Sequence, residues 1–166
     1  NLTTPFLIPN RFGLLVNDGE EVETGMFLIY KLVKTVEFNN IKSKPVPSWF
    51  RGFSAPIKFN SNLSISDKIY LVSNDSDPFN RWDSVQSLWL EYILSPKKVE
   101  ERELFDMINN LFSKDFDFAL LSEMISLPSE QIIHQNVGKI NVEEVNNKRE
   151  KSILSVGQNL NEILLE

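Results

Sequence analysis

The pattern of turn and capping residues changes near residue 60, and this change constrains the fold more than any other feature of the chain. Before it, short apolar and β-branched runs alternate with Pro, Gly and Asn, which is typical of strands and turns. After it, Ser, Asp and Asn precede apolar residues spaced three and four apart, which is typical of capped helices. This order predicts an α+β protein, with a small β-sandwich over 1–59 followed by an irregular array of antiparallel α-helical hairpins over 60–166.

Within the β part, turn residues separate the expected strands. Asn17-Asp18-Gly19 predicts a hairpin turn. The run 26–33 is apolar at nearly every position, which favours a strand that is buried on both faces or lies in the middle of a small sandwich. Segments 35–38 and 57–59 predict two further strands. The two prolines of segment 44–47 restrict it to an edge strand or an extended connector, because each removes a backbone donor.

The α part is predicted from its caps and breaks. Ser95 and Asp77 are each followed by proline, which favours the first helical position, and Asn141 with Glu144 resembles a capping box. The segment 127–129 separates two helices. The predicted N-caps are Ser66, Asp77, Ser95, Asp117 and Asn141. Since the last helical pattern has no stop signal at Glu166, we expect the array to continue beyond it.

Charge and composition exclude several classes of function. Residues 1–60 carry seven basic and five acidic residues, whereas 61–166 carry ten basic and 18 acidic ones, which argues against a nucleic-acid partner. No apolar run approaches the roughly 18–20 residues of a membrane span, and no signal-peptide pattern is present. With no cysteine and one histidine, the chain cannot form a disulfide, a Cys-zinc site or a multi-His metal site by itself.

No group of residues forms a convincing catalytic constellation. His134 lacks a second nitrogen or sulfur ligand nearby, which favours an exposed or capping histidine over a metal ligand. The acidic cluster Glu100, Glu101, Glu103 and Asp106 suits a solvated helix start better than an acid/base pair. Trp82 and Trp89 are seven residues apart, which fits core packing and, as an alternative, a binding platform. These residues predict a non-catalytic β-plus-α unit.

Four stretches, however, resemble a known enzyme family. The hexapeptide Arg51-Gly52-Phe53-Ser54-Ala55-Pro56, preceded by Pro45-Val46-Pro47-Ser48-Trp49-Phe50, resembles bacterial-type aminopeptidase N, the zinc-dependent alanyl aminopeptidases. Three more stretches match in the same order. They are Ile8-Pro9 with Gly13-Leu14-Leu15, the segment Asn74-Asp75-Ser76-Asp77-Pro78-Phe79-Asn80-Arg81-Trp82-Asp83, and Leu127-Pro128-Ser129-Glu130.

The resemblance implies which part of such an enzyme this chain represents. Residues 1–59 would be the end of the small β-sandwich, lacking its first strand, and 60–166 the first half of the C-terminal helical domain. The family's H-E-x-x-H zinc motif, downstream glutamate ligand, G-A-M-E-N motif and catalytic tyrosine belong to an upstream domain, and none has a matching position here. We therefore expect no catalytic, metal or substrate-binding residue in this chain, and zinc only in the parent protein.

The resemblance also implies a function for the parent and a role for this segment. The parent would be a cytoplasmic zinc metallo-aminopeptidase that removes N-terminal amino acids from peptides. This segment, which would be inactive alone, would link the catalytic and helical domains and form part of the wall of the active-site chamber. Its partners would be the upstream catalytic domain and downstream helices of the same polypeptide. The candidate residues of the interdomain joint are Phe50, Gly52, Phe53, Trp82 and Trp89.

Two alternatives remain open. The chain could be a free-standing β-plus-α interaction module without enzyme activity, which would require a start methionine close to Asn1. It could also belong to an inactive homologue that keeps the architecture but has lost the zinc ligands. An excised piece should expose apolar surface where its neighbours would pack, so we expect it to associate or to have a partly disordered C-terminal helix.

Overall fold

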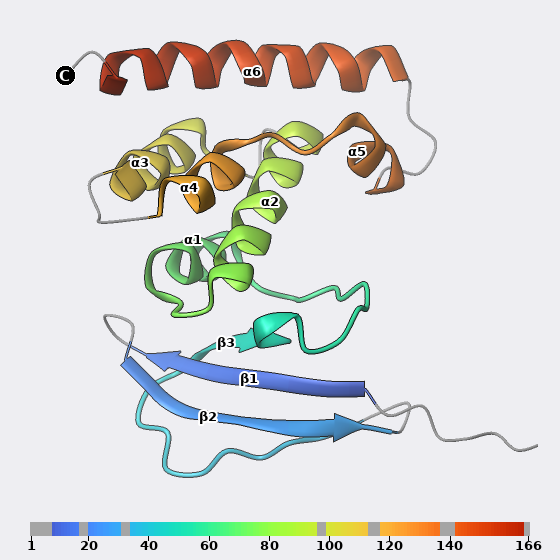
Figure 1. Ribbon diagram of the computed structural model, residues 1–166, viewed down its shortest axis with the longest axis vertical. Helices are drawn as coiled ribbons and strands as arrows, with labels where there is room; N and C mark the ends of the chain where they lie inside the picture. The colour runs from blue at the N-terminus through green and yellow to red at the C-terminus, as the bar shows by residue number, and fades with distance from the viewer. Residues whose placement is uncertain are drawn as a thin grey trace, which may run out of the picture. The chain divides into compact units, whose positions relative to one another are not determined.

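The computed structural model describes residues 8–16, 20–30, 34–95, 99–112, 117–136 and 142–164. The chain divides into two compact units, Asn1–Arg81 and Trp82–Glu166, which we call unit 1 and unit 2. A sheet precedes the helices along the chain (Figure 1), which confirms the predicted order of a β part followed by an α part.

Unit 1 is built on an antiparallel sheet whose strands lie in the order β2-β1-β3. β1 (Ile8–Val16) is central and pairs with β2 (Glu20–Ile29) and with β3 (Val46–Trp49). The pairing of β1 with β2 confirms the predicted hairpin, although its turn lies outside the described residues. β3 is an edge strand that carries Pro47, as the prolines predicted.

One face of the sheet is packed with aromatic rings. The ring of Phe12 on β1 contacts those of Phe27, Phe38 and Trp49 at centroid distances of 5.7, 5.2 and 6.2 Å. Phe12 itself is 7% exposed. Tilted rings at these distances combine large apolar burial with favourable edge contacts, so this cluster forms the core on that face of the sheet.

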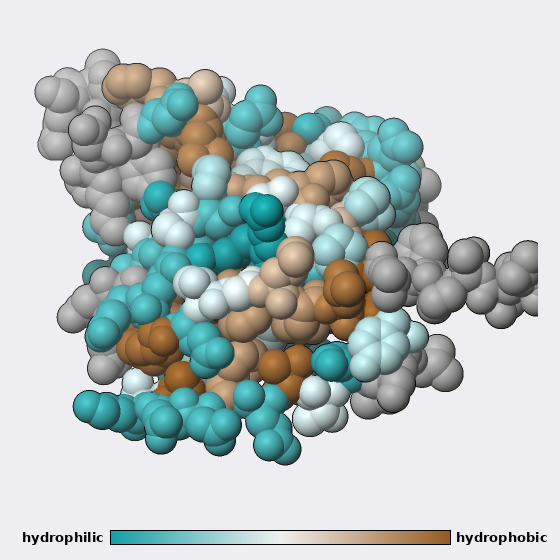
Figure 2. Space-filling view, turned by 60° about the horizontal axis from the view of Figure 1, so that its bottom comes forward, coloured by the Kyte–Doolittle hydropathy of each residue, from teal (hydrophilic) through white to brown (hydrophobic). Residues whose placement is uncertain are grey.

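Three strand predictions need correction. The apolar run 26–33 was expected to be buried on both faces, but β2 begins at Glu20 and lies at the sheet edge, with Met26 61% exposed; residues 31–33 lie outside the described part. Figure 2 shows apolar surface (brown) exposed between polar side chains (teal). Segments 35–38 and 57–59 form no strand. They contribute side chains to the aromatic packing, since the ring of Phe38 contacts that of Phe12 and the ring of Phe59 contacts that of Phe50.

The first helix, α1 (Ile65–Asn74), begins two residues earlier than predicted. Its N-cap is Ser64, whose Oγ accepts from the Asp67 N–H at 3.1 Å, while the Asp67 carboxylate accepts from the Ser64 N–H at 3.1 Å. This capping box requires an acidic residue three positions after the cap, which Ser66 lacks. The Tyr70 hydroxyl donates to the Val16 carbonyl at 2.7 Å and so fastens α1 to the end of β1.

The second helix, α2 (Pro78–Leu94), begins where the sequence predicts, with Asp77 as its cap. The Asn80 N–H donates to Asp77 Oδ1 at 2.9 Å, and Pro78 has the fixed φ that suits the first helical position. The helix starts within unit 1 and ends within unit 2, where Val85, Leu88 and Trp89 are fully buried.

Unit 2 also contains α3 (Glu101–Phe112), α4 (Phe118–Ile125), α5 (Glu130–Asn136) and α6 (Val142–Leu164). Asp117 caps α4 by accepting from the Ala119 N–H at 2.8 Å, and α4 and α5 are separated around Leu127, both as predicted. Part of the core brings together Ile93, Ile133 and Val145, from three different helices. The predicted Asn141 cap lies outside the described residues.

The start of α3 differs from the prediction of a helix beginning after Ser95. Val99 and Glu100 precede the helix, which begins at Glu101. Val99 is 1% exposed, so its side chain packs into the core before the helix starts. Glu101 and Glu103 stand in the first turn, where negative charge is favourable. In the described part of the chain, no helix has both the length and the apolarity to cross a bilayer.

Candidate functional site

The turn that follows β3 has an unusual backbone. Phe50, Gly52 and Phe53 have φ angles of 54°, 61° and 51°, and the short helix η2 (Arg51–Phe53) lies within this turn. Non-glycine residues rarely adopt this left-handed region, and each costs of order 1–3 kcal/mol that the surroundings must offset. The contacts of this turn with its surroundings must therefore offset the cost of its backbone conformation.

Several contacts fasten the turn to the start of β1. The Phe50 N–H donates to Asn10 Oδ1 at 3.1 Å, and the Phe50 ring packs edge-on against Phe59 at 5.0 Å. Ser54 Oγ accepts from the Arg11 N–H at 3.1 Å and donates to the Pro9 carbonyl at 3.3 Å. Because Asn10 is 3% exposed, its hydrogen bond to Phe50 is shielded from competing water.

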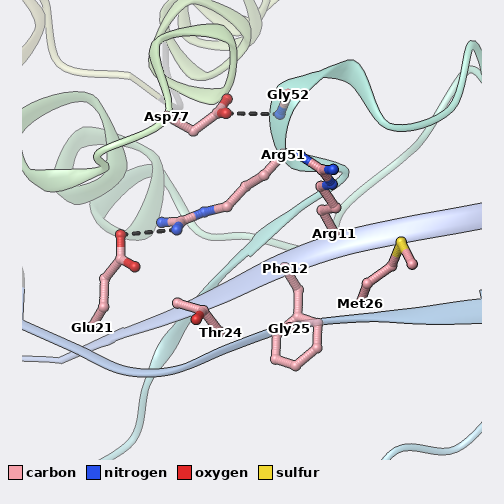
Figure 3. A pocket seen from close by; sticks show the side chains of 9 residues that line it. All are labelled: Arg11, Phe12, Glu21, Thr24, Gly25, Met26, Arg51, Gly52 and Asp77. Atoms are coloured by element: carbon pink, nitrogen blue, oxygen red, sulfur yellow. Dashed lines mark hydrogen bonds and ion pairs between the residues drawn. The ribbon is translucent and has the colours of Figure 1, made fainter.

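The guanidinium of Arg51 connects three segments of unit 1. Its Nη1 lies 2.8 Å from Glu21 Oε1 on β2, and its Nη2 lies 2.7 Å from Asp75 Oδ1, immediately after α1. Its Nε donates to Ser48 Oγ on β3 at 2.9 Å. Figure 3 shows the pair with Glu21. Charge-assisted hydrogen bonds of this kind are shorter and stronger than neutral ones, so Arg51 is the centre of a polar network that we call the Arg51 joint.

Gly13 makes room for this guanidinium. A Cβ atom added at Gly13 would lie 2.3 Å from Arg51 Cζ and 2.5 Å from Nη1. Gly13 lies on the central strand, in the Gly13-Leu14-Leu15 stretch of the resemblance, and it pairs with Ser48 of β3. The glycine is therefore required for close approach of the arginine.

Asp75 is the buried anion of the Arg51 joint. Its side chain is 0% exposed, and its Oδ1 accepts from Arg51 and from the Asp77 N–H at 2.9 Å. Its Oδ2 has no hydrogen-bond partner among the described residues. Burial raises the pKa of Asp75, and the negative charge of Asp77 adds to the rise, although hydrogen bonds and the charge of Arg51 oppose it.

The first turn of α2 completes the joint. Asp77 Oδ2 accepts from the Gly52 N–H at 2.7 Å, so the helix cap also holds the strained turn (Figure 3). The Asn80 amide donates to Ser48 Oγ at 2.6 Å and to the Trp49 carbonyl at 2.8 Å. The start of α2 is thereby bonded to both β3 and η2.

Of the five residues predicted for the interdomain joint, three lie in unit 1 and two in unit 2. Phe50 and Gly52 lie in the turn, where Phe50 is buried, and Phe53 is 55% exposed with its ring 5.1 Å from that of Phe79. Trp82 is half-buried at the first position of unit 2. Trp89 is fully buried within unit 2, where its Nε1 donates to the Met124 carbonyl at 3.2 Å. Their shared role as a joint stays a prediction.

Sequence reasoning missed how four residues of the Arg51 joint act together. Arg51, Asp75, Asp77 and Gly13 all stand in stretches that carry the family resemblance, which was a signal that they matter. Local patterns gave no indication that they meet, because the contacts join residues from separate elements. Asp77 was expected only as a helix cap, and it has that function as well.

A shallow groove borders the Arg51 joint. Its lining comes from β1, β2, the η2 turn and the residue before α2, and Figure 3 labels these residues. The lining residues are Arg11, Phe12, Glu21, Thr24, Gly25, Met26, Arg51, Gly52 and Asp77.

The other candidates for chemistry do not assemble into a site. His134 is exposed on α5, and Glu101 and Glu103 are exposed at the start of α3. In the described ranges, no group of three or more His, Cys, Asp or Glu side chains is placed to hold a metal ion. The residues described here therefore do not fit a zinc ion, which takes three or four protein ligands.

Comparison with family models finds a match in each of two parts of the chain. Residues 1–62 match the domain of unknown function DUF3458, described as an Ig-like fold. Residues 65–166 match DUF3458_C, described as ARM repeats. The two compact units of the structure instead divide after Arg81, because α1 and the start of α2 are bonded to the sheet.

Three known proteins that resemble the chain in sequence or structure are aminopeptidases. The chain is 34% identical over 125 residues to aminopeptidase N of Caulobacter vibrioides, a match covering 71% of this chain and 14% of the relative. It is 26% identical over 142 residues to aminopeptidase N of Escherichia coli, covering 75% of this chain and 16% of the relative. The structure of Legionella pneumophila aminopeptidase A in complex with aspartic acid matches with a TM-score of 0.81 and 25% identity, over 95% of this chain and 19% of that one.

The chain thus spans less than a fifth of the length of these relatives. Three of the four stretches that carry the resemblance meet at the Arg51 joint, through Gly13, Arg51 and Asp75. The matching models, relatives and structure agree with that resemblance. The chain belongs to the aminopeptidase N family, of which it carries the DUF3458 Ig-like and ARM-repeat regions.

Proposed function

We propose that this chain is a non-catalytic C-terminal segment of a zinc metallo-aminopeptidase that removes N-terminal amino acids from peptides. Its relatives are aminopeptidases, and it matches 14% and 16% of their length. Zinc and the catalytic residues would be supplied by an upstream domain, as the family resemblance implies. The parent would act in the cytoplasm on peptide substrates.

The role proposed for this segment is structural: it acts as a scaffold between domains. The observation that carries it is the Arg51 joint, in which one partly buried guanidinium connects β2 and β3 to the residue after α1. Asp77 and Asn80 then bond the start of α2 to the same turn. A network of charged groups with fixed partners gives a defined geometry that a purely apolar contact would not impose.

In the complete enzyme, this geometry would connect the catalytic domain to the helical domain. The sheet would serve as the spacer on the catalytic side, and the helices would begin the wall that limits peptide access to the active site. The partners would be the upstream catalytic domain and the downstream helices of the same polypeptide. Phe50, Gly52, Phe53, Trp82 and Trp89 remain the proposed joint residues, with Arg51 and Asp75 now added as its polar centre.

The experiment that tests this proposal is to sequence the gene across the codon for Asn1 and upstream. An open frame that contains H-E-x-x-H and G-A-M-E-N is the expected result. A frame that keeps the architecture but lacks those zinc ligands would identify an inactive homologue. A stop codon with a start methionine near Asn1 would contradict the proposal and leave a free-standing interaction module.

A further inference from the structure

An apolar stripe is exposed on β2. Met26 is 61% exposed and Leu28 42% exposed, and the two lie on one face because alternate residues of a strand do. Tyr30, just past the strand end, is 49% exposed and carries the stripe on. Contiguous apolar residues at the surface of a sheet commonly mark a surface that another segment covers.

The stripe continues into the groove beside the Arg51 joint. Arg11 of β1 is paired with Met26 of β2, so their side chains stand next to each other on the same face. Figure 3 shows both side chains rising on the side of the sheet that faces the η2 turn. Gly52 and Asp77 form the opposite rim of this groove. The groove therefore combines an apolar wall at Met26 with a cation at Arg11.

The charges around the groove are paired, with one exception. Arg51 is bound to Glu21 and Asp75, and Asp77 accepts from two backbone N–H groups. The side chain of Arg11 forms no hydrogen bond or ion pair with the residues that the structure describes, and it is exposed. An exposed guanidinium beside an apolar wall is complementary to a carboxylate flanked by an apolar side chain.

We propose that this groove is the docking site of a segment of the same polypeptide outside residues 1–166, which places a carboxylate on Arg11 and an apolar side chain on Met26. This inference rests on the proposed function, in which more than four fifths of the polypeptide lies outside the chain, as the 14% and 16% coverage of the relatives indicates. A segment of the same polypeptide has a high effective concentration, so a single carboxylate and a few apolar contacts suffice to keep it docked.

The three methionines of the chain provide a direct readout. Met26 is exposed in the groove, whereas Met107 and Met124 are 3% and 0% exposed in unit 2 and serve as internal controls for folding. The complete polypeptide is treated with hydrogen peroxide, and oxidation of each methionine is followed by peptide mass spectrometry. We expect Met26 to react at least about tenfold more slowly in the folded polypeptide than in urea. This ratio follows if Met26 reacts only when the groove is open and the docked state is populated about ten times more than the open state.

A matched pair of variants tests the carboxylate contact. Arg11→Ala in the complete polypeptide should raise Met26 oxidation severalfold toward its rate in urea, whereas Lys58→Ala, which also removes an exposed cation from unit 1, should leave it unchanged. Met107 and Met124 should stay protected in both variants. Met26 protection that survives Arg11→Ala would overturn the proposed contact with Arg11.

The outcomes separate this inference from the proposed function. Met26 that reacts in the folded polypeptide as fast as in urea would overturn the docking site, even if the sample has aminopeptidase activity. Protection of Met26 in a polypeptide without such activity would support docking while contradicting the proposed function. Protection that disappears on dilution would mean that a second copy covers the groove, which also overturns docking of the same polypeptide.

Discussion

The guanidinium of Arg51 lies in the space that a side chain at Gly13 would occupy, with Cζ 2.3 Å from the position of a Cβ atom. The central strand thus supports the arginine that connects β2, β3 and the end of α1. Because the two residues come from separate matching stretches, their contact explains why a glycine and an arginine occur together in this arrangement.

Replacing Gly13 should weaken unit 1. In Gly13→Ala the new methyl group must displace the Arg51 guanidinium and strain its ion pairs, which we expect to lower the free energy of unfolding by about 1–3 kcal/mol. Gly157→Ala is the control, because nothing lies within 4 Å of its Cβ position and its helix should gain about 0.5–1 kcal/mol. Urea titrations followed by circular dichroism measure both. A Gly13→Ala protein as stable as the unmutated chain would contradict the close approach of the Arg51 guanidinium to Gly13.

Removing the cation of the Arg51 joint should cost more. Arg51→Met leaves the Asp75 carboxyl buried without its cation, a change that typically costs roughly 3–5 kcal/mol. Asp75→Asn in the same background should recover part of this loss, and a double-mutant cycle measures the coupling. Arg102→Met removes an arginine whose partner, Asp106, is exposed and 3.7 Å away, so it should change stability by less than about 0.5 kcal/mol. Additive effects of Arg51 and Asp75 would show that the pair is not coupled.

The pH dependence of stability should reveal the burial of Asp75. Its pKa in the folded chain lies above the ordinary 3.8, because burial outweighs its hydrogen bonds and Arg51. The folded state therefore binds this proton more tightly than the unfolded chain does, and that contribution to stability is lost as pH rises through the folded-state pKa. The free energy of unfolding of Asp75→Asn relative to the parent chain should accordingly increase with pH, as urea titrations between about pH 4 and 7 would measure.

Glu21 should show the opposite trend. Partial burial raises its pKa, but hydrogen bonds from Ser76 and Arg51 and the charge of Arg51 together lower it below the ordinary 4.5. Its stabilisation is present above that value and is lost as pH falls through the folded-state pKa. Glu21→Gln should therefore destabilise most at neutral pH and least in acid. If the stability differences of Glu21→Gln and Asp75→Asn changed with pH in the same direction, the assigned environments would be wrong.

The two serines near the start of α1 should differ in their effect on stability. Ser64→Ala removes the side-chain acceptor of the capping box and should cost about 1 kcal/mol. Ser66→Ala changes an exposed residue inside the first turn and should stay within about 0.5 kcal/mol of the parent chain. Thermal unfolding of both variants measures the difference. An equal or larger loss at Ser66 would restore the cap that the sequence predicted.

The two tryptophans of α2 should also differ. Trp89→Ala removes a fully buried ring and its hydrogen bond to the Met124 carbonyl, with an expected cost of about 3–5 kcal/mol. Trp82 is half-buried, so Trp82→Ala should destabilise less. Urea unfolding of the two variants checks this order. A larger loss at Trp82 would mean that it carries more of the packing than its burial indicates.

The fold could be predicted where the signal is local. The caps at Asp77 and Asp117 and the edge position of Pro47 depend on backbone donors that the sequence itself specifies. The burial of β2 was predicted wrongly, because an apolar run does not say whether a neighbour covers it. The strand predicted for segment 35–38 was also wrong. Its β-branched and aromatic residues fit a strand, but they do not say whether the segment pairs with a neighbour, and the ring of Phe38 packs on Phe12 from a segment that lacks a strand.

The candidate site could be predicted only in part. The turn residues Phe50 and Gly52 were singled out because they belong to the hexapeptide 51–56 and the stretch 45–50 before it, which carry the family resemblance. The ion pair of Arg51 with Asp75 could not be derived, because it depends on how β3 and the end of α1 come together in space. Such long-range contacts are set by tertiary packing and leave no periodic pattern in the sequence.

The most direct measurement compares the complete polypeptide with the 166-residue chain for release of the N-terminal residue from a short peptide, together with bound zinc. We predict that the complete polypeptide binds zinc, releases the residue and loses this activity when a chelator removes the metal. The chain of 166 residues should release none. Release by that chain alone at a comparable rate, or a complete polypeptide with neither zinc nor activity, would contradict its assignment as the non-catalytic segment of a metallo-aminopeptidase.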